Sequence, residues 1–225
     1  MRKLLSNAVE ASLVLFAALL LLLNINAWSQ EKSLAPGINE RFKEQPEQSI
    51  KQFDFSSSDP GLQKEILDTL NFEPGMDIAD IGAGSGVHAC LFAEKVLPGG
   101  KVYAVDIVQE FLDHIKKKCM EKGINNVLCV MGSDTSCSLE PSSVDVVFTC
   151  DTYHHFEYPF KMMASIHRAL RPNGRFIIID FKDKSWHVRA GSKEVIEEIR
   201  KSGFELLESR EFSNMFFIAS FRAVK

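Results

Sequence analysis

Beyond Pro60, apolar residues recur first with a helical spacing and then in short β-branched runs, and this alternation continues to the end of the chain. Alternating helices and strands are typical of βαβ units and a mostly parallel sheet. The last two apolar runs are separated only by Ser213-Asn214, which predicts an antiparallel hairpin. The predicted helices cover 62–70, 89–96, 111–119, 160–170 and 192–201, and the predicted strands cover 77–81, 101–107, 127–131, 144–150, 176–181, 204–212 and 215–224.

The first thirty residues have a different pattern, with Arg2 and Lys3 followed by an unbroken apolar run over 13–23. Ala27 and Ser29 supply the small residues of a cleavage site, so residues 1–29 are interpreted as a signal peptide cut after Ser29. An uncleaved membrane anchor is the alternative. Either interpretation predicts a domain outside the cytoplasm, exported after cleavage or membrane-anchored through residues 1–29.

Residues 30–59 are polar, with isolated aromatic residues at Phe42, Phe53 and Phe55. This pattern predicts a linker with partial order. Its aromatic residues could pack over the following domain as a lid, and the alternative is a solvated connector that docks a few side chains. Residues 60–225 are then one α/β domain of ordinary size.

Composition excludes some classes of function. The net charge of −4 arises from mixed acidic and basic residues, so no nucleic-acid partner is predicted. The five cysteines lack a CxxC pair or metal-ligand spacing, so no zinc site is predicted. Cys90, Cys119 and Cys129 fall on apolar faces and are interpreted as small hydrophobic residues, without an assigned disulfide.

A glycine-rich segment from Asp80 to Gly86 lies between a predicted strand and a predicted helix. Glycine lets backbone approach a ligand closely, and a helix N-terminus favours an anionic group. Asp106, twenty residues further on, ends the next strand and suits a carboxylate that accepts hydrogen bonds from ribose hydroxyls. The glycines form GxGxG, and the dinucleotide fingerprint needs its third glycine where this chain has Val87, which disfavours a nicotinamide dehydrogenase.

These features resemble the class I S-adenosylmethionine-dependent methyltransferases of the small-molecule type, similar to methyltransferase types 11 and 25. The resemblance implies a doubly wound, mostly parallel seven-stranded sheet that ends in an antiparallel hairpin. Within the family, the segments 151–156 and 187–191 resemble an exported subgroup. The resemblance is carried by 80–86, 102–106, 132–134, 144–155 and 170–175.

The resemblance also implies a cofactor and the residues that hold it. S-adenosyl-L-methionine would have its ribose on Asp106, its adenine against Ile107, and the adenine amine near Ser133 and Asp134. Without the family, Asp134 would be interpreted as a turn residue that bonds its own backbone. The methionine end would lie on Asp80, Gly82, Ala83, Gly84 and Gly86.

The catalytic candidates are three residues in the segment that follows the fourth predicted strand. In this strand order the crevice opens beside that strand, so Asp151, His154 and His155 are expected near the transferable methyl group, where Asp151 would also contact the cofactor. The protein must align the acceptor and accept its proton, which suits histidine. Histidine at a pocket rim is otherwise a hydrogen-bonding wall residue. Neighbouring residues rarely converge on one ion, so no metal is predicted.

The predicted reaction is in-line methyl transfer to a small-molecule or lipid-like acceptor, with no protein partner evident. A domain that binds the cofactor without catalysis is the main alternative, and a dehydrogenase is disfavoured. Two departures from the family pattern are Val87-His88, where an aromatic residue is common, and Asn173 in place of a turn glycine. Asn tolerates left-handed backbone, so the second change is mild.

Overall fold

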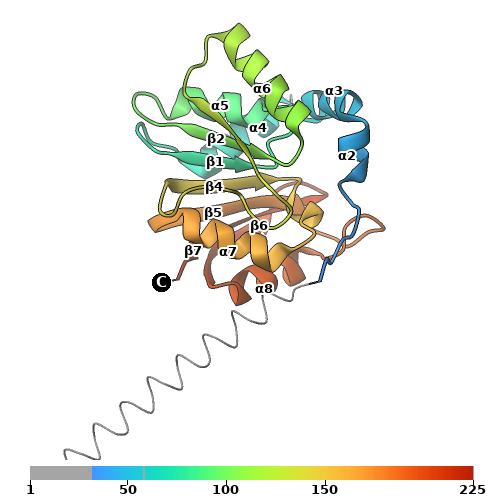
Figure 1. The fold of residues 1–225 in the computed structure, drawn as a ribbon. Helices are drawn as coiled ribbons and strands as arrows, with labels where there is room; N and C mark the ends of the chain where they lie inside the picture. The colour runs from blue at the N-terminus through green and yellow to red at the C-terminus, as the bar shows by residue number, and fades with distance from the viewer. Residues whose placement is uncertain (1–31, 58, 225) are drawn as a thin grey trace, which may run out of the picture. The chain divides into compact units, whose positions relative to one another are not determined.

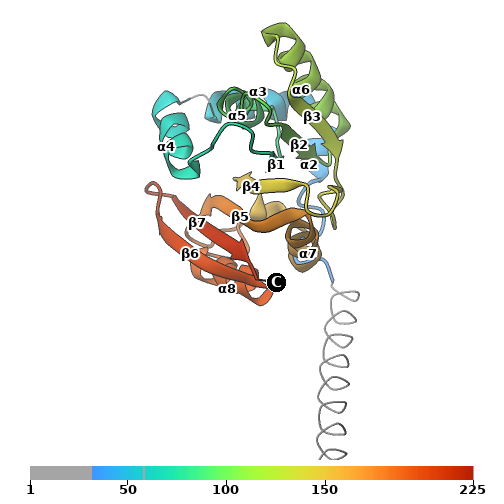
Figure 2. The ribbon, with the colours of Figure 1, turned by 90° about the vertical axis from the view of Figure 1, so that its left-hand side faces the viewer.

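The computed structural model describes residues 32–57 and 59–224, and its elements are drawn in Figures 1 and 2. The export segment predicted at 1–29 lies outside the described residues. Across the described ranges, no helix combines the length and apolar character needed to span a membrane. The helices are α2 (Glu40–Glu44), α3 (Pro46–Ser56), α4 (Pro60–Leu70), α5 (Val87–Lys95), α6 (Gln109–Lys122), η1 (Tyr153–His155), α7 (Pro159–Ala169) and α8 (Ser192–Lys201). The strands are β1 (Ile78–Ile81), β2 (Val102–Asp106), β3 (Val127–Met131), β4 (Val144–Cys150), β5 (Leu170–Phe181), β6 (Phe204–Glu211) and β7 (Phe216–Ala223).

The seven strands form one sheet in the order β3-β2-β1-β4-β5-β7-β6. The first five are parallel to their neighbours, β7 is antiparallel to β5, and β6 is antiparallel to β7. Successive strands are added on one side of β1 as far as β3 and then on its other side from β4 onward. The strand order therefore reverses between β1 and β4, which are parallel neighbours. The predicted fold class and terminal hairpin are confirmed.

Helices cover both faces of the sheet (Figure 2), as the near-continuous apolar character of the central strands requires. On one face, α4, α5 and α6 pack over a core that includes Ile66, Phe92, Ile115 and Phe148. On the other face, α7 and α8 pack over a second core. The carboxyl ends of β1, β2 and β4 therefore meet at one edge, with helices on both sides.

Two segments differ from their predicted local structure. Residues 40–56, where no regular structure was predicted, form α2 and α3 (Figure 1). The sequence Arg171-Pro172-Asn173-Gly174, which is typical of a turn between the predicted helix 160–170 and the predicted strand 176–181, lies inside β5, because Leu170 and Arg175 on its two sides both pair with β4. Asn173 has a φ of 67°, the left-handed conformation that its side chain tolerates. The turn is thus an irregularity within β5, with paired residues on both sides of it.

Candidate active site

A cavity of about 230 Å³ lies at the carboxyl edge of the sheet. Its walls come from the loop after β1, the ends of β2 and β4, the turn after β3 and the two N-terminal helices. This is the position where open α/β sheets hold ligands. The predicted residues that line it are Gly82, Ala83, Gly84, Asp106, Ile107, Ser133, Asp134, Asp151 and His155, whereas Asp80, Gly86 and His154 are not among the lining residues.

Glycines shape the floor of this cavity through backbone conformation. Gly82 and Gly84 have φ values of 74° and 53°, which residues with a side chain rarely adopt. A Cβ on Gly82 would lie 2.3 Å from the Thr152 side chain, and a Cβ on Gly84 would lie 3.0 Å from the Phe53 ring. Neither position can carry a larger residue without displacement of a cavity wall.

Asp80 lies behind the loop and not on the cavity wall. Its strand position directs it to the face covered by α5, where it accepts a hydrogen bond from the backbone N–H of Ala89. Gly86, the N-cap of α5, has no side chain to supply such a bond, so Asp80 serves the first turn of the helix in its place. Burial, followed by the charge of Asp106, raises the pKa of Asp80 to about 7. Its Oδ2 is buried without a partner.

Asp106 connects the end of β2 to the glycine loop. Its Oδ2 accepts a hydrogen bond of 2.9 Å from the Gly84 N–H, and its Oδ1 accepts one of 3.1 Å from the Val108 N–H. Burial raises the pKa of Asp106, and these backbone hydrogen bonds partly oppose the shift. Each carboxylate oxygen retains a further lone pair for a ligand. Ile107 follows on the same wall.

The turn after β3 contributes a second carboxylate. Asp134 has its Oδ1 buried with no hydrogen-bond partner, and the residue lines the cavity. Ser133 beside it is exposed, and its hydroxyl accepts a hydrogen bond from the Thr135 N–H. A buried acceptor without a donor is costly unless a ligand supplies one. Asp134 is therefore available for a donor group of a bound molecule.

Asp151 stands where β4 ends and the chain turns, with a φ of 54°. Burial of its carboxylate raises the pKa of Asp151 to about 6. The residue as a whole is still exposed to solvent. The charge of His154 opposes this shift and that of Asp180 adds to it. A carboxylate with this pKa can exchange a proton near neutral pH.

The two candidate histidines have different environments. His155 lines the cavity, and burial followed by the charge of His154 lowers its pKa to about 3, so its ring is neutral. Its Nδ1 is buried without a partner, and its ring contacts that of Phe42 edge-on at 5.1 Å. This arrangement suits a hydrogen bond to a ligand better than proton acceptance.

His154 lies one layer deeper and forms a pair with Asp180 of β5. The His154 Nδ1 is 2.8 Å from the Asp180 Oδ1, and both side chains are almost fully buried. Burial acts to lower the pKa of His154, but the hydrogen bond and charge of Asp180 outweigh it and raise the pKa. Asp180 could not be identified from the sequence, because nothing near an acidic residue inside an apolar strand indicates which distant residue it pairs with.

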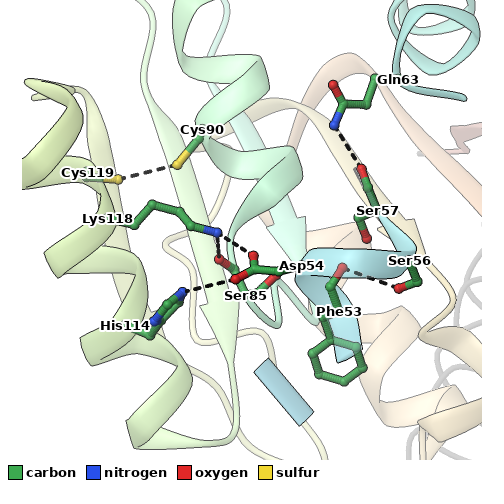
Figure 3. A network of polar contacts seen from close by, with 10 residues as sticks. All are labelled: Phe53, Asp54, Ser56, Ser57, Gln63, Ser85, Cys90, His114, Lys118 and Cys119. Atoms are coloured by element: carbon green, nitrogen blue, oxygen red, sulfur yellow. Dashed lines mark hydrogen bonds and ion pairs between the residues drawn. The ribbon is translucent and has the colours of Figure 1, made fainter. Parts of the chain in front are cut away.

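The N-terminal helices α2 and α3 contribute Arg41, Phe42 and Phe53 to the lining of the cavity. The rings of Phe42 and Phe53 pack on Phe111 of α6, with centroids 6.4 and 5.7 Å from it. Figure 3 shows that Asp54 of α3 bonds Lys118, whose Nζ also donates to the carbonyl of Ser85 in the glycine loop, at 2.6 and 2.8 Å. One lysine thus joins α3, α6 and the loop.

Further upstream, the chain is held beside the catalytic candidates. The Ser33 hydroxyl and the Gly37 N–H donate to the Glu157 carboxylate, and the Asn39 side chain donates to the His155 carbonyl. Sequence reasoning missed this set of contacts, and Pro46 as a helix-starting residue was the one available signal for α3. His88 was noted only as a departure from pattern, yet it lines the cavity, and burial lowers its pKa to about 4.

The chain matches one protein family. The sequence model described as "Methyltransferase domain" matches residues 79–178, the segment from β1 into β5 that includes the glycine loop and the carboxyl ends of the strands.

Individual relatives agree with this match. A protein-L-isoaspartate O-methyltransferase of Aeropyrum pernix is 32% identical over 124 residues, which are 54% of this chain and 45% of the relative. The nocamycin O-methyltransferase of Saccharothrix syringae is 30% identical over 51% of this chain and 41% of its own. The chain spans about half the length of the curated relatives it matches. A crystal structure of an S-adenosylmethionine-dependent methyltransferase from Aquifex aeolicus shares the fold, with a TM-score of 0.71, 23% identity, and coverage of 79% of this chain and 98% of the other.

Proposed function

The chain carries a class I S-adenosylmethionine-dependent methyltransferase domain, and from this premise we propose that it methylates a small-molecule or lipid-like acceptor by in-line displacement. The observation that carries the proposal is the cavity at the carboxyl edge of the sheet, where left-handed glycines and unpartnered acceptors face the same space. When bound, S-adenosylmethionine supplies an electrophilic methyl group on a sulfonium.

The residues present fit the donor. The glycine loop presents backbone that a Cβ would obstruct, Asp106 has acceptor capacity for ribose hydroxyls, and Asp134 Oδ1 lacks a partner that an adenine amine would provide. Ile107 offers an apolar face to the base. Asp80 acts indirectly in this proposal, because it holds the first turn of α5 and so the end of the loop.

Asp151 is the group we assign to receive the acceptor's proton. It lines the cavity, and its pKa of about 6 leaves it ionised at neutral pH, as a general base must be. His155, neutral and with an unpartnered Nδ1, would orient the acceptor by a hydrogen bond. His154 does not line the cavity, so we assign it an indirect role. It pairs with Asp180, and its charge opposes the rise in the pKa of Asp151 that burial and Asp180 cause.

The acceptor class rests on the apolar residues of the cavity wall. Phe42, Phe156 and Met162 line the same cavity as Asp151, so an acceptor with an apolar body meets complementary surface. Arg41 also lines the cavity and provides a cation for an anionic end of such a molecule. The nocamycin O-methyltransferase is a relative with a small-molecule name, whereas the isoaspartate enzymes are relatives named for a protein substrate.

Transfer of a tritiated methyl group from S-adenosylmethionine tests the proposal. The protein is incubated with phenols, quinols, fatty acids and an isoaspartyl peptide, and labelled products are separated by extraction into organic solvent. We expect label in the extracted small molecules and loss of that label in Asp151→Asn. Label confined to the peptide would overturn the acceptor class, and donor binding without any labelled product would favour the non-catalytic alternative.

We also propose that residues 1–29 direct the domain out of the cytoplasm, by cleavage after Ser29 or as an anchor. The support is the charged start, the apolar run and the small residues at 27 and 29. N-terminal sequencing of the protein from separated cell fractions tests this. A chain that begins at Gln30 supports cleavage, an intact Met1 in membranes supports the anchor, and an intact Met1 in soluble cytoplasm contradicts both.

A further inference from the structure

Two buried cysteines face each other across the interface of α5 and α6. The side chains of Cys90 and Cys119 point toward each other (Figure 3). Their Sγ atoms are 3.8 Å apart, and the two residues are only 5% and 6% exposed. Both are free thiols in the structure. Neither takes part in the cavity described above.

The two helices approach each other closely along this interface. Gly86 and Cys90 are four residues apart in and before α5, and Ile115 and Cys119 are four residues apart in α6, so each pair lies on one helix face. A Cβ on Gly86 would lie 2.6 Å from the Ile115 side chain. The Gly86–Ile115 and Cys90–Cys119 contacts are therefore successive layers of one interface, which fixes the cysteines opposite each other.

We propose that Cys90 and Cys119 are an oxidisable pair that closes to a disulfide between α5 and α6. A disulfide has an S–S distance of about 2.05 Å, so the sulfurs must approach by a little under 2 Å. Side-chain rotation and a small shift of two packed helices provide movement of that size. Cys129, a further thiol on this side of the sheet, instead donates to the carbonyl of Leu112 at 3.5 Å and so points toward α6.

The chemistry is thiol–disulfide exchange with a small disulfide such as oxidised glutathione. One protein thiolate attacks a glutathione sulfur and expels one glutathione, and the second protein thiolate attacks the mixed disulfide at the protein sulfur and expels the other. The protein loses two protons and two electrons, and the oxidant becomes two glutathione thiols.

Burial affects the rate and the equilibrium of this exchange in opposite ways. Burial, followed by the proximity of Cys90, raises the pKa of Cys119 to about 12, so few thiolates form and exchange is slow. In strongly oxidising disulfide proteins, the reduced form is stabilised as a thiolate, which makes the disulfide easy to reduce. Here the raised pKa of Cys119 shows that the thiolate is disfavoured. Once formed, the bond should therefore resist reduction by glutathione.

The bond would tighten the frame of the glycine loop. Cys90 lies one helical turn after that loop, and Cys119 follows Lys118, which bonds the Ser85 carbonyl and Asp54 (Figure 3). A cross-link between residues 29 positions apart restricts the unfolded chain. We expect oxidation to raise the melting temperature by about 5–10 °C.

Mass spectrometry of the full chain, equilibrated in glutathione buffers from both the reduced and the oxidised side, tests the proposal. We expect a loss of 2 Da with a peptide linkage between Cys90 and Cys119, absent in Cys119→Ser and retained in the matched control Cys137→Ser, together with the higher melting temperature. Five free thiols at every buffer ratio, a linkage through Cys129, or a linked protein that melts at or below the reduced one would overturn it.

Discussion

At the scale of single residues, the carboxylates of the site differ by what each already bonds. Asp106 accepts from two backbone N–H groups, so it holds the glycine loop as well as any ligand. Asp80 supports a helix start, and Asp134 keeps a buried oxygen free. The three aspartates thus have different roles, and substitutions should separate them.

Asp106→Ala should weaken binding of S-adenosylmethionine by about 1.5–3 kcal/mol, because it removes charge-assisted hydrogen bonds. It also leaves the N–H groups of Gly84 and Val108 without partners, which should lower the free energy of unfolding by about 1–3 kcal/mol. Calorimetric titration and urea unfolding measure the two effects. Asp106→Asn retains an acceptor oxygen and is the milder control. Unchanged affinity in both variants would remove Asp106 from the donor site.

Gly82→Ala should block donor binding and destabilise the fold, because the added Cβ would lie 2.3 Å from Thr152 at a φ of 74°. The same variant combined with Thr152→Gly should recover part of the stability, since the clash is with that side chain. Thermal shift with S-adenosylhomocysteine reports both. Ligand stabilisation equal to that of the wild type in the single variant would show that the loop does not contact the donor.

Asp80 should make stability depend on pH. Its pKa is about 7 in the folded chain against an ordinary value of 3.8, so between these values only the folded state holds the proton. The free energy of unfolding should therefore fall as pH rises from about 4 to 7, by up to ~1.4 kcal/mol per pH unit from this group, and level off above 7. Urea unfolding of the wild type and of Asp80→Asn measures the difference. The same slope in both proteins would contradict this account of Asp80.

At the scale of elements, the helices α2 and α3 join the site to a segment interpreted from sequence as a linker. These helices have few apolar residues, so the sequence alone does not indicate a buried face. In the structure, Phe42, Ile50 and Phe53 pack in one cluster with residues of the segment that begins α6, namely Val108 and Phe111. Such contacts between distant segments cannot be read from local spacing. We interpret the pair of helices as a lid over the donor.

Phe53→Ala should raise the dissociation constant for S-adenosylmethionine by about 5–30-fold, because the ring lies against Gly84 and packs on Phe111. Phe55→Ala, on the same helix but with a side chain that is 86% exposed, is the matched control and should bind as the wild type does. Calorimetry measures both. Equal affinity in the two variants would leave α3 as a connector.

The elements of the sheet could be predicted with accuracy because each has a strong apolar period and a clear boundary. β3, β4 and α8 begin and end at the predicted residues. β5 differed because a turn sequence with Pro172 and Asn173 is accommodated inside a strand whose two ends both pair with β4. Local preference predicted the turn, and the register of a distant strand determined its place.

At the scale of the whole molecule, the sheet topology brings together residues that lie far apart in the sequence. The glycine loop, Asp106, Asp134 and Asp151 lie at or after the carboxyl ends of four different strands, and the doubly wound sheet places them at one edge. The sequence could identify the glycine loop, Asp106 and Asp151 because strand ends are recognisable, whereas Asp134 is assigned through the family resemblance. It could not identify Asp180 or the N-terminal wall, since their partners lie 26 residues and more away.

The pH dependence of turnover tests how the assembled site handles the proton. With Asp151 as the base, the rate should rise with pH through about 6 and level off above it, because the carboxylate must be ionised to accept a proton. Asp151→Asn should lower the rate by about 10²–10⁴-fold. A pH profile that is the same in both proteins would assign the proton to another group.

Calorimetric titration of the full chain with S-adenosylmethionine, and separately with a nicotinamide dinucleotide, tests the central claim most directly. The account predicts one saturable site per chain for S-adenosylmethionine and for its demethylated product, weakened by Asp106→Ala and by Phe53→Ala, and no binding of the dinucleotide. Absence of binding by folded wild-type protein, or preference for the dinucleotide, would contradict it.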